Sequence, residues 1–209
     1  MKKVALLIVF FGFYFPAHQA ISGGDPDGQF ITGPQIGANS CRYYDVPIYD
    51  RMAQTFTAET TARLEQIRIW LSQGFGQPGN YYYGPGGSSS RVGLKLYEGH
   101  GVDGPLLGTS TSTVKLVPGM DSDFRPFFWR SWDNKNKPDL YLTKGRVYTF
   151  EVYYTAGNKS RIRYAQCYST YPFETLYQIT GSTQSFISNA TGMAYKVITS
   201  PAPQPKPAN

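Results

Sequence analysis

The chain has 209 residues, enough for one domain with a sizeable core, and carries a net charge of +6 at neutral pH. Charged residues make up only 16% of it, whereas Tyr, Phe, Gly and Pro are frequent, a composition typical of an all-β domain rich in turns. The basic residues are scattered rather than clustered, which argues against nucleic acid as a partner.

Residues 1–20 have the pattern of a secretory signal peptide. Lys2 and Lys3 precede an apolar run from Val4 to Phe15 that is too short to cross a bilayer. An uncleaved membrane anchor is the alternative interpretation. The pattern predicts a secreted, extracellular or cell-surface protein whose mature chain has no membrane span.

Residues 21–40 are rich in Gly, Asp and Pro, which predicts an extended lead-in with a short edge strand at Phe30 and Ile31. The alternative is a donor strand that pairs with a neighbouring subunit, because exposed sheet edges invite such pairing. Self-assembly through residues 21–40 is therefore one candidate interaction.

The mature chain contains two cysteines, Cys41 and Cys167. An even number of cysteines in an exported chain predicts one disulfide, here between the first core strand and a late strand. Two separate buried thiols are the alternative.

Alternation of apolar and polar residues predicts the core strands. The stretch from Ala53 to Ser72 predicts two strands separated by a polar turn. Leu64 is out of phase with the apolar residues that follow it, so we expect a bulge or a strand start near Glu65. The residues expected to face the core beyond that point are Ile67, Ile69 and Leu71.

The rest of the chain contains further short strands. The segment from Phe124 to Trp132 is aromatic, and Pro126 places it at a sheet edge or a bulge. Residues 156–160 predict a hairpin loop that leads into a strand from Arg161 to Tyr168. Together these segments predict a β-sandwich over residues 41–199, with a jelly-roll path as the best fit and a Pro-rich tail at 200–209. The remaining predicted strands are Cys41 to Tyr49, Val92 to Tyr97, two strands or one long bent strand over Leu106 to Leu116, Val147 to Thr155, and three between Leu176 and Thr199.

The order of these motifs resembles that of the jelly-roll modules found in exported bacterial surface proteins and beside carbohydrate-active enzymes. Those modules share an Ala-Gln-Thr-Phe-Thr-Ala opening, here residues 53–58, and a Leu-x-x-Ile-x-Ile-x-Leu strand, here Leu64 to Leu71. A Leu-x-x-Gly-x-x-Tyr-x-Phe strand comes later, here Leu142 to Phe150. The chain departs from the pattern at Gly192, where such modules often have an acidic residue. The resemblance covers about residues 50–199 and implies a fold more than a ligand.

Aromatic side chains are the main candidate ligand contacts, because flat rings stack on sugar rings. A long Gly-rich loop carries Tyr81, Tyr82 and Tyr83, which cannot all face a core, since neighbouring side chains of an extended chain point to opposite sides. Trp129 and Trp132 are the other candidates, and at most one of them is expected in the core. Ordinary packing is the alternative role for all five.

Signals for catalysis or metal binding are weak. The mature chain has one histidine, His100, and no nucleophile elbow of the G-x-S-x-G kind, so we expect no catalytic residue, no cofactor and no metal. A polar turn is preferred to a structural calcium ion at Asp121 and Asp123. Glycoside hydrolysis would need two facing carboxylates, and Glu151 is interpreted instead as part of a solvated strand face. The glutamates considered for such an enzyme are Glu98, Glu151 and Glu174.

These features predict an exported, non-catalytic module that binds glycan or another cell-surface polymer. The first alternative is a structural or adhesive subunit of a surface layer, filament or extracellular matrix, which the lead-in and the Pro-rich tail favour. A secreted polysaccharide-cleaving enzyme is the third hypothesis.

Overall fold

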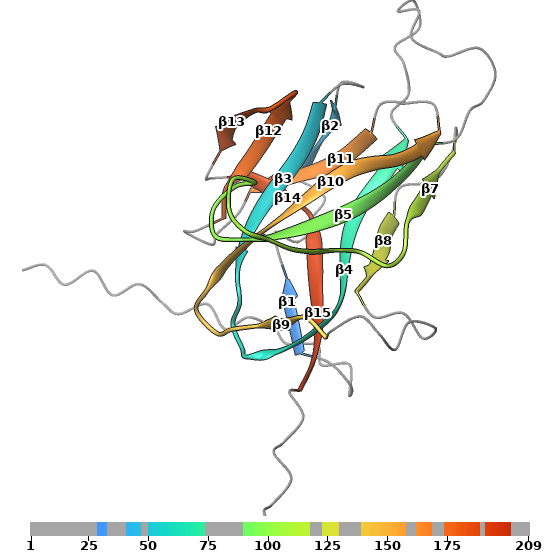
Figure 1. Cartoon of the computed structure of the whole chain (residues 1–209). Helices are drawn as coiled ribbons and strands as arrows, with labels where there is room; N and C mark the ends of the chain where they lie inside the picture. The colour runs from blue at the N-terminus through green and yellow to red at the C-terminus, as the bar shows by residue number, and fades with distance from the viewer. Residues whose placement is uncertain are drawn as a thin grey trace, which may run out of the picture.

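The structure, a computed structural model, describes residues 29–32, 41–46, 50–73, 90–117, 123–129, 139–157, 162–168, 174–188 and 191–201. Over these ranges the protein is all β and contains no helix, and its strands form two antiparallel sheets (Figure 1). The predicted all-β class is therefore confirmed. The predicted signal peptide and most of the Pro-rich tail lie outside the described residues. Within the described ranges, no helix is long and apolar enough to cross a membrane.

The first sheet has eight strands. They are β1 (Gln29–Thr32), β2 (Cys41–Val46), β4 (Ala62–Gln73), β8 (Asp123–Phe128), β9 (Tyr141–Leu142), β11 (Ile162–Tyr168), β14 (Thr191–Met193) and β15 (Tyr195–Pro201). The main path runs β1-β15-β4-β11-β14, while β2 pairs with β11, and β8 and β9 pair with β4. Strand β1 contains Phe30 and Ile31 and pairs with β15 of the same chain.

The second sheet has seven strands. They are β3 (Asp50–Thr57), β5 (Ser90–Glu98), β6 (Leu106–Thr109), β7 (Val114–Leu116), β10 (Val147–Gly157), β12 (Leu176–Thr180) and β13 (Thr183–Ser188). Their order is β13-β12-β3-β10-β5-β6, with β7 also paired to β5. Figure 1 shows β3, β10 and β5 at the centre of this sheet, in front of the strands of the eight-stranded sheet.

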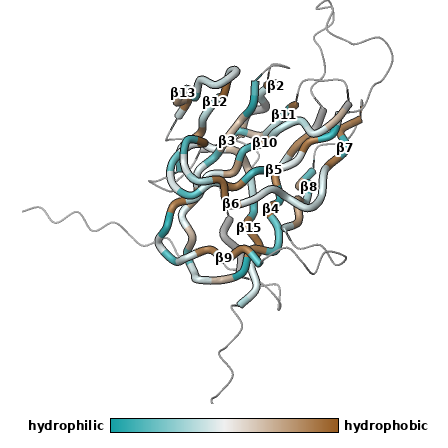
Figure 2. The backbone as a smooth tube through the Cα atoms, viewed as in Figure 1, coloured by the Kyte–Doolittle hydropathy of each residue, from teal (hydrophilic) through white to brown (hydrophobic). Residues whose placement is uncertain are grey.

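Both sheets turn one face toward a shared hydrophobic core, as in a β-sandwich. The alternation that places this face inward is visible as brown and teal segments along the strands in Figure 2. Leu64 is buried as well, because the register between β4 and β15 skips Glu65, which confirms the bulge expected there. Fully buried side chains from the two sheets include Ile67, Ile69, Leu71, Leu94, Leu96 and Phe150.

The hairpin predicted around residues 156–160 is wrong. Strand β10 pairs with β3 on one side and β5 on the other, whereas β11 pairs with β2, β4 and β14 in the opposite sheet. The chain therefore crosses from one sheet to the other between β10 and β11. Closeness in sequence favours a hairpin, but both hydrogen-bonding edges of β10 are already occupied by strands from elsewhere in the chain.

The disulfide between Cys41 and Cys167 is confirmed. It joins β2 to β11 at directly opposite positions of the ladder. Cys167 is fully buried and belongs to a second, smaller apolar cluster on which Trp70 and Phe124 pack. The bridge therefore fastens β2 to β11 in the interior of the eight-stranded sheet.

Candidate functional site

The surface of the seven-stranded sheet that points away from the core carries a buried carboxylate in contact with two cationic side chains and a phenol. Phe150 and Val152 of β10 face the core, so Glu151 between them faces the other way. The ladder places Glu151 opposite Ala53 of β3 and Lys95 of β5. We call the surface formed by Arg51, Lys95, Tyr97, Glu151 and Tyr153 the Glu151 face.

Glu151 is fully buried, so its interpretation as part of a solvated strand face is wrong. Its carboxylate accepts hydrogen bonds from Arg51 Nη1 and, over 2.7 Å, from the hydroxyl of Tyr97. The ammonium of Lys95 lies 3.7 Å from the same carboxylate. These partners replace water around the charge, which is the condition for burying an ionised group.

The two cationic partners stay within reach of solvent. The side chain of Arg51 is 29% exposed, and that of Lys95 is 27% exposed. Arg51 is fixed at its far end, because Nη2 donates a 2.7 Å hydrogen bond to the carbonyl of Gly181 in the turn between β12 and β13. One buried acid thus holds two half-exposed cations, which leaves the cluster with one excess positive charge.

Tyr153 lies beside this cluster with its ring over Gly93. The two residues are opposite each other in the ladder between β10 and β5, and a Cβ at Gly93 would come within 3.2 Å of the Tyr153 ring and hydroxyl. The absence of a side chain at Gly93 therefore leaves the space that the Tyr153 ring occupies against the sheet. The Lys95 ammonium is 5.0 Å from the ring centroid, within the range of a cation–π contact.

The segment between β5 and β6 folds back over part of the outer surface. Its two positive-φ glycines are Gly99 and Gly101 (φ 89° and 78°), and Gly101 N donates to Thr149 Oγ1 over 2.9 Å. Val102 N donates to Gln184 Oε1 over 2.6 Å, which links this segment to β13. Gln184 also fills the space that a side chain at Gly101 would need. The segment around His100 is therefore held against the outer surface by contacts with β10 and β13.

Burial raises the pKa of Tyr97 well above its usual range, and the hydrogen bond to the Glu151 carboxylate adds to the shift. The phenol of Tyr97 therefore stays protonated, and a hydrogen-bond donor, to a higher pH than that of an ordinary tyrosine. The Glu151 face is therefore a fixed array of a protonated phenol, a guanidinium and an ammonium around one carboxylate.

The residues singled out from the sequence lie elsewhere. Tyr81, Tyr82, Tyr83 and Trp132 are outside the described residues, so their contact with a ligand stays a prediction. Trp129 is only 9% exposed and belongs to the main core, because it follows the buried Phe127 by two positions and shares its inward face. Packing therefore accounts for Trp129, and its ring offers no open surface for stacking.

The glutamates considered for catalysis are dispersed. Glu98 forms an ion pair with Arg146, while Glu174 accepts a hydrogen bond from Tyr195 in the core. Asp121 lies outside the described residues, and no group of three His, Cys, Asp or Glu side chains suited to a metal ion occurs within them. The carboxylate of Glu151 is bonded to two cations and a phenol, an arrangement that differs from a pair of facing acids.

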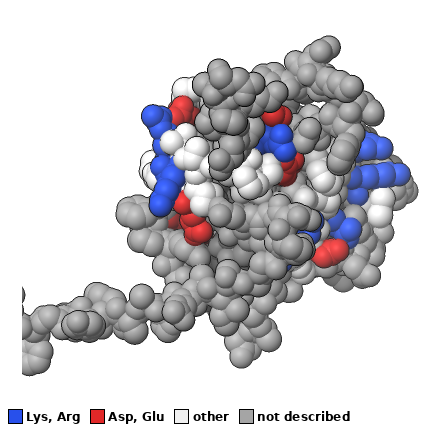
Figure 3. Space-filling view, turned by 90° about the horizontal axis from the view of Figure 1, so that it is seen from below, with Lys and Arg blue, Asp and Glu red and all other residues white. Residues whose placement is uncertain are grey.

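On the face drawn in Figure 3, the charged side chains of the described residues are separated rather than gathered into one patch. Figure 3 shows Lys and Arg in separate groups, several of them next to Asp or Glu.

No known protein-family model matches the chain, and no curated protein matches it. The geometry of the Glu151 face is therefore the basis for a functional conclusion.

Sequence reasoning missed Arg51, Lys95, Tyr97 and Tyr153 as members of one site. The period of β10 places Glu151 and Tyr153 on one face, and Gly93 within an alternating strand is a signal of close approach by another group. The pairing of β10 with β3 and β5 was needed to bring the cations to them.

Proposed function

We propose that this protein is an exported, non-catalytic jelly-roll module that binds glycan at or outside the cell surface. The observation that carries the proposal is the Tyr153 ring lying on Gly93 beside the half-exposed cations Lys95 and Arg51. An aromatic ring provides apolar contact for the C–H face of a sugar, and the two cations provide hydrogen-bond donors for its oxygen atoms.

The buried carboxylate of Glu151 supports this role by fixing the donors. Arg51 and Lys95 both have long side chains that would lose rotational freedom about several bonds when they bind a ligand. Their attachment to Glu151, together with the bond from Arg51 to Gly181, restricts that freedom before a ligand arrives. Preorganisation of this kind favours affinity because less entropy is lost on binding.

The test compares two tyrosines on opposite sheets. The mature protein is applied to a glycan array, and affinity for any glycan found is measured for the native chain, for Tyr153→Ala and for Tyr44→Ala. Tyr44 is the matched control, since it is 42% exposed on β2 and stacks on Tyr164 in the other sheet. Loss of one aromatic contact should weaken binding by about 1–3 kcal/mol in Tyr153→Ala alone.

Two results would contradict the proposal. One is a native protein that binds no glycan, and the other is an equal loss in both variants. The loop containing Tyr81, Tyr82 and Tyr83 is expected to extend the site, because long loops are more often functional than short ones. Replacing these three residues with Ala should then lower affinity without changing the melting temperature.

A second candidate is a structural or adhesive subunit of a surface layer, filament or matrix. The favouring observation is β1, a four-residue strand from the lead-in that pairs antiparallel with β15 at the edge of the eight-stranded sheet. Such a strand can instead pair with β15 of a neighbouring copy. Deleting residues 21–40 should abolish assembly of such a subunit in light scattering, and unchanged assembly would exclude this route.

A further inference from the structure

Strand β13 forms one edge of the seven-stranded sheet, contains no charged residue and exposes two large apolar side chains. Among the described strands only β12 pairs with it, so its other row of backbone N–H and C=O groups points away from the sheet. Phe186 on this strand is 61% exposed, the largest exposure among the large apolar side chains that the structure describes, and Ile187 is 38% exposed. An edge of this kind is a template for pairing with another strand.

The usual protection of an edge strand is missing from this segment. Natural edges are blunted by charged side chains or by Pro, and residues 175–195 contain no Asp, Glu, Lys, Arg, His or Pro. A bulge at Ile187 interrupts the ladder with β12, but it lies near the end of β13 and leaves Thr183 to Phe186 in regular register. The backbone before the bulge is therefore free of the features that deter pairing.

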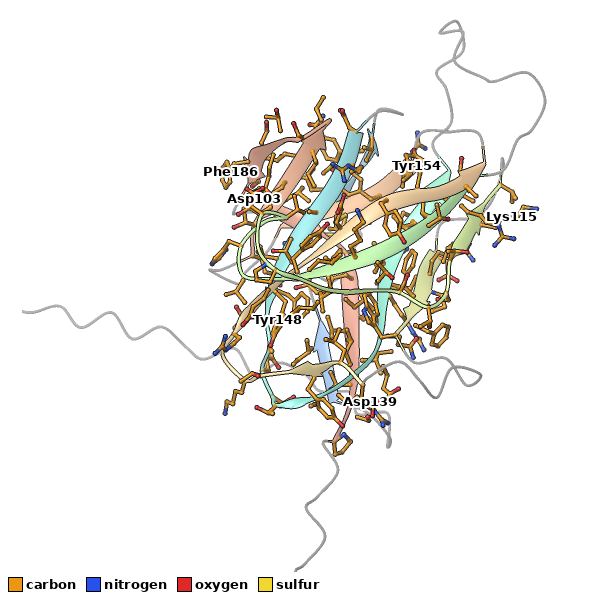
Figure 4. All side chains as sticks on the ribbon, in the orientation of Figure 1. Asp103, Lys115, Asp139, Tyr148, Tyr154 and Phe186 are labelled. Atoms are coloured by element: carbon orange, nitrogen blue, oxygen red, sulfur yellow. A yellow bond between two sulfur atoms is a disulfide. The ribbon has the colours of Figure 1, made fainter. Side chains whose placement is uncertain are left out.

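The other edge of the same sheet contrasts with β13. There β7 carries the exposed Lys115, and Figure 4 shows Lys115 and Phe186 at opposite ends of the sheet. The apolar residue Leu106 on β6 is 53% exposed near that end. The two ends thus offer similar apolar exposure but differ in charge, which allows a matched comparison.

We propose that β13 pairs antiparallel with β13 of a second copy of this chain, about a two-fold axis perpendicular to the sheet. An antiparallel edge is self-complementary, because the same rotation that presents donors to acceptors also presents acceptors to donors. The pairing covers Phe186 in both copies and joins the two seven-stranded sheets into one continuous sheet.

The distribution of charge makes this edge the place where two copies of the chain can meet. The chain has a net charge of +6, so two copies repel each other over most approaches. The uncharged residues 175–195 allow them to meet without placing like charges opposite each other in the new ladder.

The proposed symmetry also sets the direction of the two Glu151 faces. A two-fold axis perpendicular to the sheet leaves the outer surfaces of both copies on the same side. If that face binds glycan, a consequence that rests on the proposed function, the dimer presents two sites to one polymer surface and gains avidity. Pairing itself requires no ligand.

Sedimentation velocity of the full-length mature protein, measured without glycan over a concentration series, tests the pairing. The variants are Phe186→Lys and, as the matched control, Leu106→Lys at the opposite end of the sheet. The native protein and Leu106→Lys should sediment as dimers, whereas the dimer dissociation constant of Phe186→Lys should rise by at least about tenfold. Measured at a concentration below the native dimer dissociation constant, where all three are monomers, the melting temperatures should agree, because both side chains are exposed.

A native protein that remains monomeric at every concentration would overturn the proposal. Equal weakening by Leu106→Lys would also overturn it, since that residue belongs to β6, the strand at the other end of the sheet order from β13. Assemblies larger than a dimer would refute the closed two-fold symmetry. If Phe186→Lys lowers the melting temperature, Phe186→Ser replaces it, and a dimer unaffected by that variant refutes the role of β13. The absence of glycan in these measurements separates this result from the test of glycan binding.

Discussion

Replacing both Cys41 and Cys167 with Ala should lower the free energy of unfolding by about 2–5 kcal/mol. The bridge joins positions separated by 126 residues, so it restricts a large part of the unfolded chain. In the folded state it connects strands that already face each other in a ladder, and its loss removes no strand pairing. The main effect is therefore expected on the unfolded ensemble.

The size of the effect follows from the length of the closed loop. The chain-entropy relation for a loop of this length gives about 5 kcal/mol at 25 °C, and native disulfides in small exported domains typically contribute about 2–5 kcal/mol. Packing adds to this value, because Cys167 is fully buried among Ala165 and Ala194 with Trp70 and Phe124 against the cluster. An Ala replacement keeps these positions apolar but removes both sulfur atoms, so the variant loses this packing together with the covalent bond.

Urea unfolding followed by circular dichroism measures the difference. The double variant should unfold at lower urea than the native protein, and reduced native protein should behave like the variant. Reductant should leave the variant unchanged, which controls for other effects of the reagent. Equal unfolding midpoints and slopes for the oxidised native protein and the double variant would refute the reasoning.

Three further predictions concern buried polar groups and a close approach. Glu151→Gln should lower the free energy of unfolding by about 1–3 kcal/mol. This is less than the cost of breaking a fully buried ion pair, because the two cationic partners of Glu151 are partly exposed. An unchanged urea midpoint would contradict the prediction. Gly192→Ala should lower the free energy of unfolding by about 1–3 kcal/mol, because the new Cβ would lie 2.9 Å from Gln54 Oε1. The control Gly108→Ala should lower it much less, since the nearest atom to that Cβ is 4.0 Å away. Equal effects of the two variants would refute the close packing at Gly192. Because the pKa of Tyr97 is raised in the folded protein, this residue stabilises the fold fully at pH values below its unfolded-state pKa of 10.0, and the stabilisation should be lost as the pH rises above 10.0. A phenolate titration in which every tyrosine ionises near its ordinary pKa would exclude the shift.

Local features of the sequence were sufficient for the elements of the fold. The inward positions of Ile67, Leu94 and Phe150 follow from alternation, because neighbouring residues of a strand point to opposite faces wherever the strand is placed. The bulge at Glu65 follows from a break in the same alternation. The disulfide could be predicted because two cysteines allow a single pairing.

Strand partners could not be predicted in the same way. The chain between β10 and β11 has the length of a hairpin, yet both edges of β10 are taken by β3 and β5, which are distant in sequence. The burial of Trp129 likewise depends on the sheet that its strand joins. Pairing is decided by the whole set of competing strands, and the sequence of one short segment does not show which other strands compete for its edges.

The sequence by itself determined an all-β chain, its core positions and its one disulfide, because these depend on residue type and on a period of two. Tertiary structure alone decided that Glu151 is buried and that Arg51 and Lys95 surround it. Those three residues come from three strands, and their contact depends on the register of two ladders. Register is set by cooperative packing across the sheet, so a site made of side chains from neighbouring strands exists only once the sheet has formed.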